Sequence, residues 1–174
     1  EAFEGLSQYA RSEASEENHY EEFRLADVIE EARQRVDRLE AAEARVRVRS
    51  GRSADEALVI QSNRGLLVMA LSNLIGNALK YTSEGGSVVA RWWCDDDGGH
   101  FSVTDTGLGI APEHLPRLTE RFYRVDPGRS RSSGGSGLGL AIVKHALQRH
   151  GGRLDVASEL GKGSTFSCHI PSSR

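Results

Sequence analysis

Three observations predict that this chain folds as one α/β domain. Apolar residues recur with the helical period of about 3.6 over residues 25–44 and 63–81. Shorter stretches between and after these two segments alternate at period two or lie between turn-forming residues, as strands do. The chain has 174 residues, 38% of them hydrophobic, which is enough to build the core of a single domain.

Composition and charge argue against several classes of protein. The net charge of −3 argues against a general nucleic-acid binder, which would be basic. Cys94 and Cys168 match no metal-binding spacing and fit buried thiols in a reducing compartment, with a disulfide left open. No apolar run approaches the roughly 18 residues of a membrane span, and no signal peptide is visible. Because the only methionine is Met69, we expect a piece of a longer protein.

The first quarter of the chain predicts a helix flanked by short strands. Residues 1–21 are acidic and are expected to be either the tail of an upstream helix or a frayed end, with Glu21–Arg24 as an edge strand. The helix that follows is amphipathic and is expected to reach about Ala44. Arg45–Arg49 alternates at period two, and its arginines fit a solvated strand face better than a nucleic-acid contact. Ala57–Ile60 is the next expected strand.

A long buried helix is expected from a cap at Asn63 to Tyr81. Asn73, Asn77, Lys80 and Tyr81 share one stripe of this helix because of their spacing. Asparagine is a poor helix former, so two of them on one face of an apolar helix require an explanation. One explanation is a polar edge at the helix surface. The other is a pair of amide oxygens placed for a phosphate-bound cation such as Mg²⁺, with Lys80 adding charge.

A hairpin is expected next, and a candidate ligand site follows it. Ser87–Cys94 and His100–Thr104 are the expected strands, joined by Asp95–Gly99. The acidic triplet in this turn lacks calcium-site spacing, so a solvated turn is favoured. The second strand leads into Asp105–Ile110, where glycines admit a flat ligand and the carboxylate can accept a bond from the amine of adenine, selecting ATP over GTP. A simple turn closed by an Asx bond is an equal alternative.

The segment after this site predicts a lid. Pro112–Thr119 is expected to form a short helix with its proline in the first turn. Glu120–Asp126 contains two aromatic residues between arginines, and the following stretch holds almost nothing apolar. We interpret residues 125–136 as a lid, which supplies or adjoins three candidate phosphate ligands, Arg124, Arg129 and Arg131.

Three glycines at alternate positions (Gly135, Gly137 and Gly139) lead into a helix-forming stretch. Glycine lets the backbone approach a ligand, and a helix start offers unpaired N–H groups and a partial positive charge, which favour a phosphate. An ordinary flexible loop is the alternative. After the helix C-cap, the last two expected strands form a closing hairpin (Arg153–Ala157 and Ser164–Ile170).

In combination these stretches resemble the motifs of the bacterial sensor histidine kinases, in the right order over about residues 22–171. The corresponding segments are the N box Asn73–Thr82, the G1 box Asp105–Gly109, the F box Arg121–Arg124, the G2 box Gly135–Leu140 and the last glycine box Gly161–Ser164. The run from Ile110 to His145 is especially similar to the phosphate-regulon sensor kinase subfamily.

The resemblance implies a Bergerat fold, an α/β (α+β) two-layer sandwich with a mixed sheet of about five strands and helices on one face. The expected order of strands and helices agrees with it. The implied cofactors are ATP and Mg²⁺, with Asn77 as the metal ligand, Asn73 beside the phosphates, and Lys80 and Arg124 positioning phosphate. The other implied nucleotide contacts are Tyr81 for phosphate or ribose, Asp105 for the adenine amine, Gly107, Gly109 and Ile110 for the base pocket, Gly135, Gly137, Leu138 and Gly139 for the phosphates, and Ser164 for the adenine end.

Two departures from the family pattern are visible. Ser62-Asn63 replaces the Gly-Asp that usually heads the N-box helix, and it still provides a cap. The family's phospho-acceptor histidine lies in an H-[DE]-x-x-x-P setting, which none of the histidines in this chain has (His19, His100, His114, His145, His150 and His169). The nucleophile is therefore expected on another domain.

We expect residues 22–174 to be the catalytic ATP-binding domain of a protein-histidine kinase that is inactive alone, and residues 1–21 to be the tail of an upstream dimerisation domain or a linker. Expected partners are ATP or ADP, the histidine-bearing dimerisation domain of the same homodimeric kinase, and a response regulator, without nucleic acid. The domain would be cytoplasmic, without a span of its own, and the full-length protein anchored in the inner membrane. The alternatives are a nucleotide-binding regulatory module and another ATPase of the wider superfamily.

Overall fold

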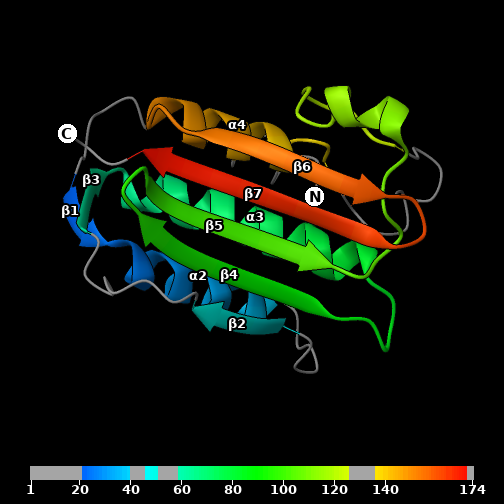
Figure 1. Ribbon diagram of the computed structural model, residues 1–174, viewed down its shortest axis with the longest axis horizontal. Coiled ribbons are helices and arrows are strands. Elements are labelled where there is room, and N and C mark those ends of the chain that lie inside the picture. The colour runs from blue at the N-terminus through cyan, green and yellow to red at the C-terminus, as the bar shows by residue number, and fades with distance from the viewer. Residues whose placement is uncertain (1–20, 40–45, 51–58, 126–135, 172–174) are drawn as a thin grey trace.

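The computed structural model describes residues 21–39, 46–50, 59–125 and 136–171 and has two sheets (Figure 1). The larger sheet has five strands in the order β2-β4-β5-β7-β6, and a separate two-stranded sheet pairs β1 with β3. β2 runs parallel to β4, whereas the other neighbours are antiparallel, so the five-stranded sheet is mixed as predicted. The strands are β1 (Glu21–Arg24), β2 (Val46–Ser50), β3 (Val59–Ser62), β4 (Val88–Asp95), β5 (Gly98–Asp105), β6 (Arg153–Glu159) and β7 (Gly163–Pro171).

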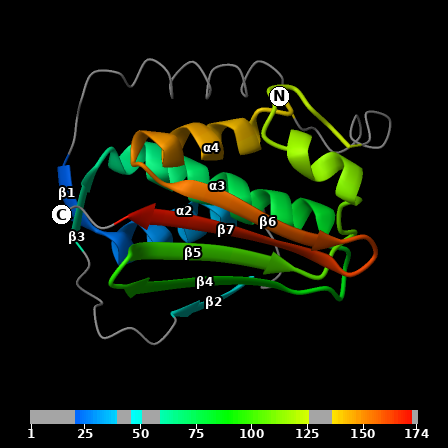
Figure 2. The same ribbon diagram turned by 45° about the horizontal axis from the view of Figure 1, so that its top comes forward.

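Helices α2 (Leu25–Leu39), α3 (Arg64–Tyr81) and α4 (Gly139–Arg149) lie on one face of the larger sheet (Figures 1 and 2). α3 packs against both α2 and α4. The short 3₁₀ helix η1 (Pro112–Arg117) lies near the end of β6. The opposite face of the sheet carries no helix of the described residues (Figure 2). The predicted two-layer α/β sandwich is thereby confirmed.

The core lies between the sheet and the helices. Strands β4 and β7 alternate between buried and more exposed residues, because successive side chains of a strand point to opposite faces. Their buried rows meet the apolar side of α3, which is wide and includes Leu67, Leu71, Leu74 and Ile75 at 0–1% exposure. This arc leaves only a narrow polar stripe on α3, the one that contains the two predicted amide residues.

The ends of α3 are set by side-chain caps. Asn63 adopts an extended backbone conformation, and its Oδ1 accepts a hydrogen bond from the N–H of Leu66 at 3.0 Å. At the other end Thr82 leaves the helical conformation, and its hydroxyl donates to the carbonyl of Ala78 at 2.6 Å. The predicted helix from an Asn63 cap to Tyr81 is confirmed at both boundaries.

Other boundaries differ from expectation by small amounts. Within the described residues β3 spans Val59–Ser62 and continues past the expected end at Ile60, because its pairing with β1 extends to the Glu21–Ser62 pair, next to the helix cap; the expected start at Ala57 falls outside the described residues. α2 ends at Leu39 in the described residues, and the expected extension toward Ala44 falls outside them. The short helix after Pro112 is of the tighter 3₁₀ type and contains a second proline, Pro116, which has no N–H to donate.

Both cysteines are free and buried, as expected for structural thiols. Burial, and to a lesser extent the charge of Asp155, raises the pKa of the Cys168 thiol to about 12. A thiol with this pKa stays protonated and unreactive at neutral pH. Among the described residues, no helix combines the length and apolar character that crossing a membrane requires.

Candidate nucleotide site

The start of α4 lies against the polar stripe of α3. A Cβ placed on Gly139 would lie 3.5 Å from Oδ1 of Asn73 and 3.8 Å from Nδ2 of Asn77. Two motifs more than 60 residues apart in the sequence therefore meet in space. Nδ2 of Asn73 is buried and has no hydrogen-bond partner among the described residues. A buried amide without a partner is costly, so a ligand group that bonds to this amide would remove that cost.

The first turn of α4 is uncapped. Leu138 precedes the helix without a side-chain cap, and the first turn contains no acidic residue. Its free N–H groups and the positive end of the helix dipole therefore face the region beside Asn73 and Asn77 without a competing anion from the same turn. This arrangement favours a phosphate group at the junction of α3 and α4.

The F-box segment, Arg121–Arg124, contacts the glycine-containing loop before α4 through its backbone. The N–H of Phe122 donates to the carbonyl of Gly137 at 2.9 Å. Gly137 has a φ of 71°, and a Cβ there would lie 2.8 Å from Cα of Phe122. Phe122 itself has a φ of 64°, an uncommon conformation for a residue with a side chain, and the residue is 60% exposed. The F box thus contacts the loop at Gly137 through its main chain, and Phe122 itself is largely exposed to solvent.

Asp105 forms the other end of the site. It lies at the end of β5, is 6% exposed, and its Oδ1 accepts a hydrogen bond from the N–H of Gly107 at 2.8 Å. Burial raises the pKa of this carboxyl, and the N–H groups of Gly107 and Ser164 partly offset the effect. The Asx turn considered from the sequence is therefore present. A carboxylate has about four acceptor positions, so it retains capacity for a further donor.

Gly107 joins this turn to the end of α3. A Cβ on Gly107 would overlap the carbonyl oxygen of Tyr81, so the close approach requires glycine. The N–H of Leu108 donates to the same Tyr81 carbonyl at 3.2 Å. The N-box helix and the Asp105 turn are thereby tied together by the backbone.

The β6–β7 turn packs against the loop that follows Asp105. Ser164 is buried and pairs in register with Asp105 across β5 and β7. The N–H of Gly161 donates to the carbonyl of Leu108 at 2.7 Å, and Gly109 packs so closely on Glu159 that a Cβ would overlap its carbonyl. The last glycine box therefore abuts the Asp105–Gly109 loop, as expected from the family pattern.

Ser158 is a positioning residue that the sequence reasoning missed. Its hydroxyl donates to the carbonyl of Gly163 at 3.0 Å, accepts from the N–H of Ile110 at 2.8 Å, and lies 2.9 Å from the hydroxyl of Ser164. It occupies an inward position of β6, so period-two alternation from Leu154 identifies it as an unusual polar residue on the core side.

The remaining candidates occupy varied environments. Tyr81 is 46% exposed and has the ammonium of Lys80 5.6 Å from its ring centroid. Arg124 is half-buried. Leu138 is 1% exposed and packs with Ala141 and Ile142, so its side chain belongs to the core and only its backbone is left for a ligand. Gly135 and the lid arginines, Arg129 and Arg131, lie outside the described residues.

The chemistry of the donors fits a nucleotide with Mg²⁺. Two neutral amides face a positive helix end, and hard cations prefer such oxygen ligands together with phosphate oxygens and water. Within the part of the chain that the structure describes, no three histidine, cysteine or acidic side chains cluster to hold a metal by themselves. A cation at this site would depend on the phosphates of the ligand.

Comparison with known proteins agrees with this geometry. Residues 62–174 match the model of the family described as histidine kinase-, DNA gyrase B- and HSP90-like ATPases, and the chain belongs to that family. It is thus an ATP-binding domain, and its relatives place it with the catalytic domains of two-component sensor histidine kinases.

Three further matches specify the similarity. The phosphate regulon sensor protein PhoR of Pseudomonas aeruginosa is 56% identical over 117 residues, which cover 67% of this chain and 26% of that protein. The mycobacterial sensor histidine kinase MprB has a solved structure with a TM-score of 0.71 and 29% identity, covering 87% of this chain and 97% of that one. A structure of full-length ShkA in complex with AMPPNP gives a TM-score of 0.76 at 29% identity, covering 96% of this chain and 34% of that one. The chain spans about a quarter of the length of the PhoR relative.

Proposed function

We propose that this domain binds Mg-ATP and donates its γ-phosphate to a histidine on a separate dimerisation domain of the same kinase. The observation that carries the proposal is the meeting of the Asn73–Asn77 stripe with the uncapped start of α4, at one end of a site whose other end is the buried carboxylate of Asp105. ShkA, which the chain resembles in structure, was solved with an ATP analogue, AMPPNP.

At the base end, the carboxylate of Asp105 accepts a hydrogen bond from the exocyclic amine of adenine. The backbone at Gly107, Gly109 and Ile110 forms the flat wall of the base pocket. Ser164 supports this end from the neighbouring strand, where its hydroxyl lies 2.9 Å from that of Ser158. Guanine presents a carbonyl in place of the amine, so a carboxylate here repels it.

At the phosphate end, the N–H groups in the uncapped first turn of α4 bind phosphate oxygens. Asn77 is the ligand of Mg²⁺, and Asn73 donates to a phosphate through its Nδ2, which has no partner within the described part of the chain. Tyr81 contacts the ribose or a phosphate. Lys80 and Arg124 position the γ-phosphate and oppose the negative charge that spreads over its oxygens during in-line attack. Bound Mg²⁺ would supply further charge neutralisation between phosphate groups.

The rest of the kinase lies outside this domain. We propose that residues 1–21 connect to a dimerisation domain that carries the acceptor histidine, and that residues 22–174 are the catalytic domain. The partners would be that domain, within a homodimer, and a response regulator that takes up the phosphoryl group. The parent protein would be anchored in the inner membrane with this domain in the cytoplasm.

Calorimetric titration of the chain with ATP, in the presence and absence of Mg²⁺, tests the proposal. We expect ATP binding that Mg²⁺ strengthens, and we expect Asn77→Ala to remove the part that depends on Mg²⁺. Incubation with labelled ATP is expected to give no phosphohistidine until a histidine-bearing dimerisation domain is added. Phosphohistidine on the chain alone would contradict the assignment of the acceptor to another domain. Nucleotide binding without transfer to any added acceptor domain would support a regulatory module instead.

A further inference from the structure

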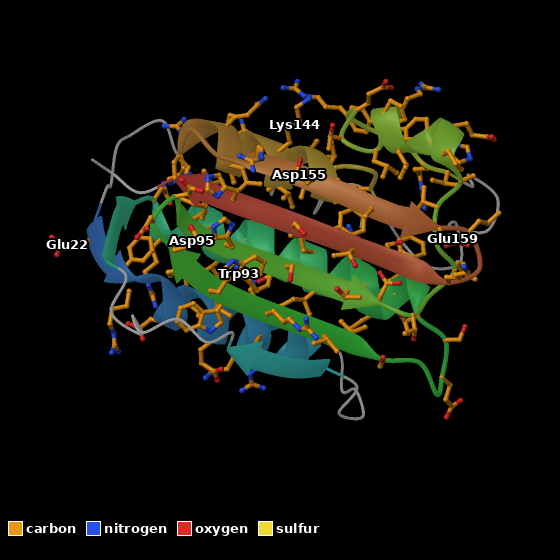
Figure 3. All side chains as sticks on the ribbon, viewed as in Figure 1. Glu22, Trp93, Asp95, Lys144, Asp155 and Glu159 are labelled. Atoms are coloured by element: carbon orange, nitrogen blue, oxygen red, sulfur yellow. The ribbon has the colours of Figure 1, made fainter. Side chains whose placement is uncertain are left out.

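The face of the sheet that carries no helix presents a row of large side chains across four strands. Trp93 on β4, His100 on β5, His169 on β7 and Arg153 on β6 are in register with one another. Trp93 and the neighbouring Asp95 lie on the face that is turned to the viewer in Figure 3. Nothing in the proposed phosphotransfer uses this row.

The two histidines of this row, His100 and His169, have ring nitrogen atoms close to each other. Nδ1 of His100 and Nδ1 of His169 are 3.3 Å apart, and the two ring centroids are separated by 4.7 Å at an interplanar angle of 41°. A tetrahedral Zn²⁺ ion with Zn–N bonds of about 2.0–2.1 Å holds its two nitrogens roughly 3.3–3.4 Å apart. The observed separation of the two Nδ1 atoms therefore matches that of two nitrogen ligands bound to a single metal ion.

The neighbours of His100 hold its ring in the orientation that such a site needs. Its Nε2 lies 2.9 Å from Oδ2 and 3.0 Å from Oδ1 of Asp95. When Nε2 carries the proton donated to this carboxylate, Nδ1 is left as the bare nitrogen, which is the usual carboxylate–histidine–metal arrangement. The ring of Trp93 stacks on the other side at 4.9 Å with an interplanar angle of 4°.

The surrounding charges also favour a cation. Asp95, Asp96 and Asp97 form an exposed acidic turn next to His100. Burial, and to a lesser extent charged neighbours that include Arg153, lowers the pKa of His169. The opposing positive charge of Arg153 is partly offset by the negative charge of Asp155, because Nε of Arg153 lies 3.1 Å from Oδ2 of Asp155. The acidic triplet thus raises the local concentration of cations without itself being a ligand set.

We propose that His100 and His169 form a surface site for an imidazole-preferring divalent cation of the Zn²⁺, Ni²⁺ or Cu²⁺ class. Because the described residues contain no third histidine, cysteine or acid that completes the site, its other coordination positions are open to water or to an outside ligand. The site lies five residues along β5 from Asp105, or about 17 Å, and on the opposite face of the sheet, so it is distinct from the nucleotide site.

Titration of the tag-free chain with Cu²⁺ in the absence of nucleotide tests the proposal through tryptophan fluorescence. We expect quenching that saturates at one ion per chain, because the ion would lie beside the ring that stacks on Trp93. His100→Asn and His169→Asn are each expected to weaken binding by at least about 10-fold, and Asp95→Asn by about 10-fold through loss of the orienting contact. Calorimetry with Zn²⁺, which does not depend on quenching, should rank the variants in the same order.

His150→Asn is the matched control. This histidine is on α4 and its Nδ1 lies 2.6 Å from the carbonyl of Ala146, a contact that an asparagine amide can replace. The control should bind Cu²⁺ and Zn²⁺ as the unmodified chain does, and circular dichroism should show that all four variants are folded. A shared proton between the two rings, rather than a metal site, would give no saturable binding. That result, or equal binding by the unmodified chain and both histidine variants, would overturn the proposal.

Discussion

At the scale of single residues, the site combines groups that are costly in the folded protein but useful to a ligand. Among the described residues, Nδ2 of Asn73 is buried without a partner, and the carboxyl of Asp105 is buried and accepts hydrogen bonds from the backbone N–H groups of Gly107 and Ser164. Neither arrangement stabilises the empty domain. Functional sites commonly contain such destabilising polar groups, so these two residues mark the candidate site independently of any motif.

Asp105→Asn is predicted to leave the empty domain equally stable or more stable at neutral pH. Burial raises the folded-state pKa of Asp105, so the stability that this group contributes is fully present below the ordinary carboxyl pKa and is lost as pH rises through the folded value. The stability advantage of the variant should therefore be largest near pH 7 and shrink toward pH 4. Thermal unfolding of both proteins over this range measures the difference. The burial argument would be contradicted if the stability of the variant, measured relative to the unmodified chain, were lower at pH 7 than at pH 4.

Gly107→Ala is predicted to destabilise the domain by about 1–3 kcal/mol, because the added methyl group overlaps the carbonyl of Tyr81. Gly76→Ala is the matched control. A Cβ at Gly76 meets nothing within 4 Å, so alanine should stabilise α3 by about 0.5–1 kcal/mol through helix propensity alone. Urea unfolding of the two variants gives opposite shifts if the contact is as described. Equal shifts would show that the approach of Gly107 to α3 is not close.

At the scale of elements, the sequence predicted helices and strands best where the chemistry of a side chain marks the end of an element. The cap at Asn63 and the apolar arc of α3 fixed that helix at both ends. The strands that carry Asp105 and Ser164 were also predicted, because alternation and turn residues are local signals. Two features had no such signal. The φ of 64° at Phe122 arises from its backbone contact with Gly137, and the role of Ser158 depends on strand register that a single strand does not encode.

Asn63→Ala is predicted to destabilise the domain by about 1 kcal/mol, or roughly 2–4 °C in Tm, because Leu66 loses its cap acceptor. Asn63→Asp keeps the acceptor and adds a favourable charge at the helix start, so it should have little effect or a small stabilising one. Differential scanning calorimetry compares the two. Equal losses from both substitutions would show that the cap does not set the start of α3.

At the scale of the whole molecule, two layers supply the two ends of the proposed site. The proposed phosphate end lies between α3 and α4, whereas the proposed base end lies where β5 ends and β7 begins. The Asp105–Gly109 loop joins them, because it contacts both the Tyr81 carbonyl and the β6–β7 turn. The lid was predicted from composition, but Arg129 and Arg131 lie outside the described residues, so their roles stay predictions.

The central claim is that these two ends bind one adenine nucleotide, and parallel calorimetric titrations with Mg-ATP and Mg-GTP test it most directly. A hydrogen bond to a charged group contributes about 1.5–3 kcal/mol, so ATP should bind roughly 10- to 150-fold more tightly than GTP. In Asp105→Asn, Oδ1 keeps its bond from Gly107 and the NH₂ group of the side-chain amide faces the adenine amine, so ATP affinity should fall by a similar factor and the preference should disappear. Equal affinities for ATP and GTP in the unmodified chain, or ATP binding unchanged in Asp105→Asn, would contradict the account.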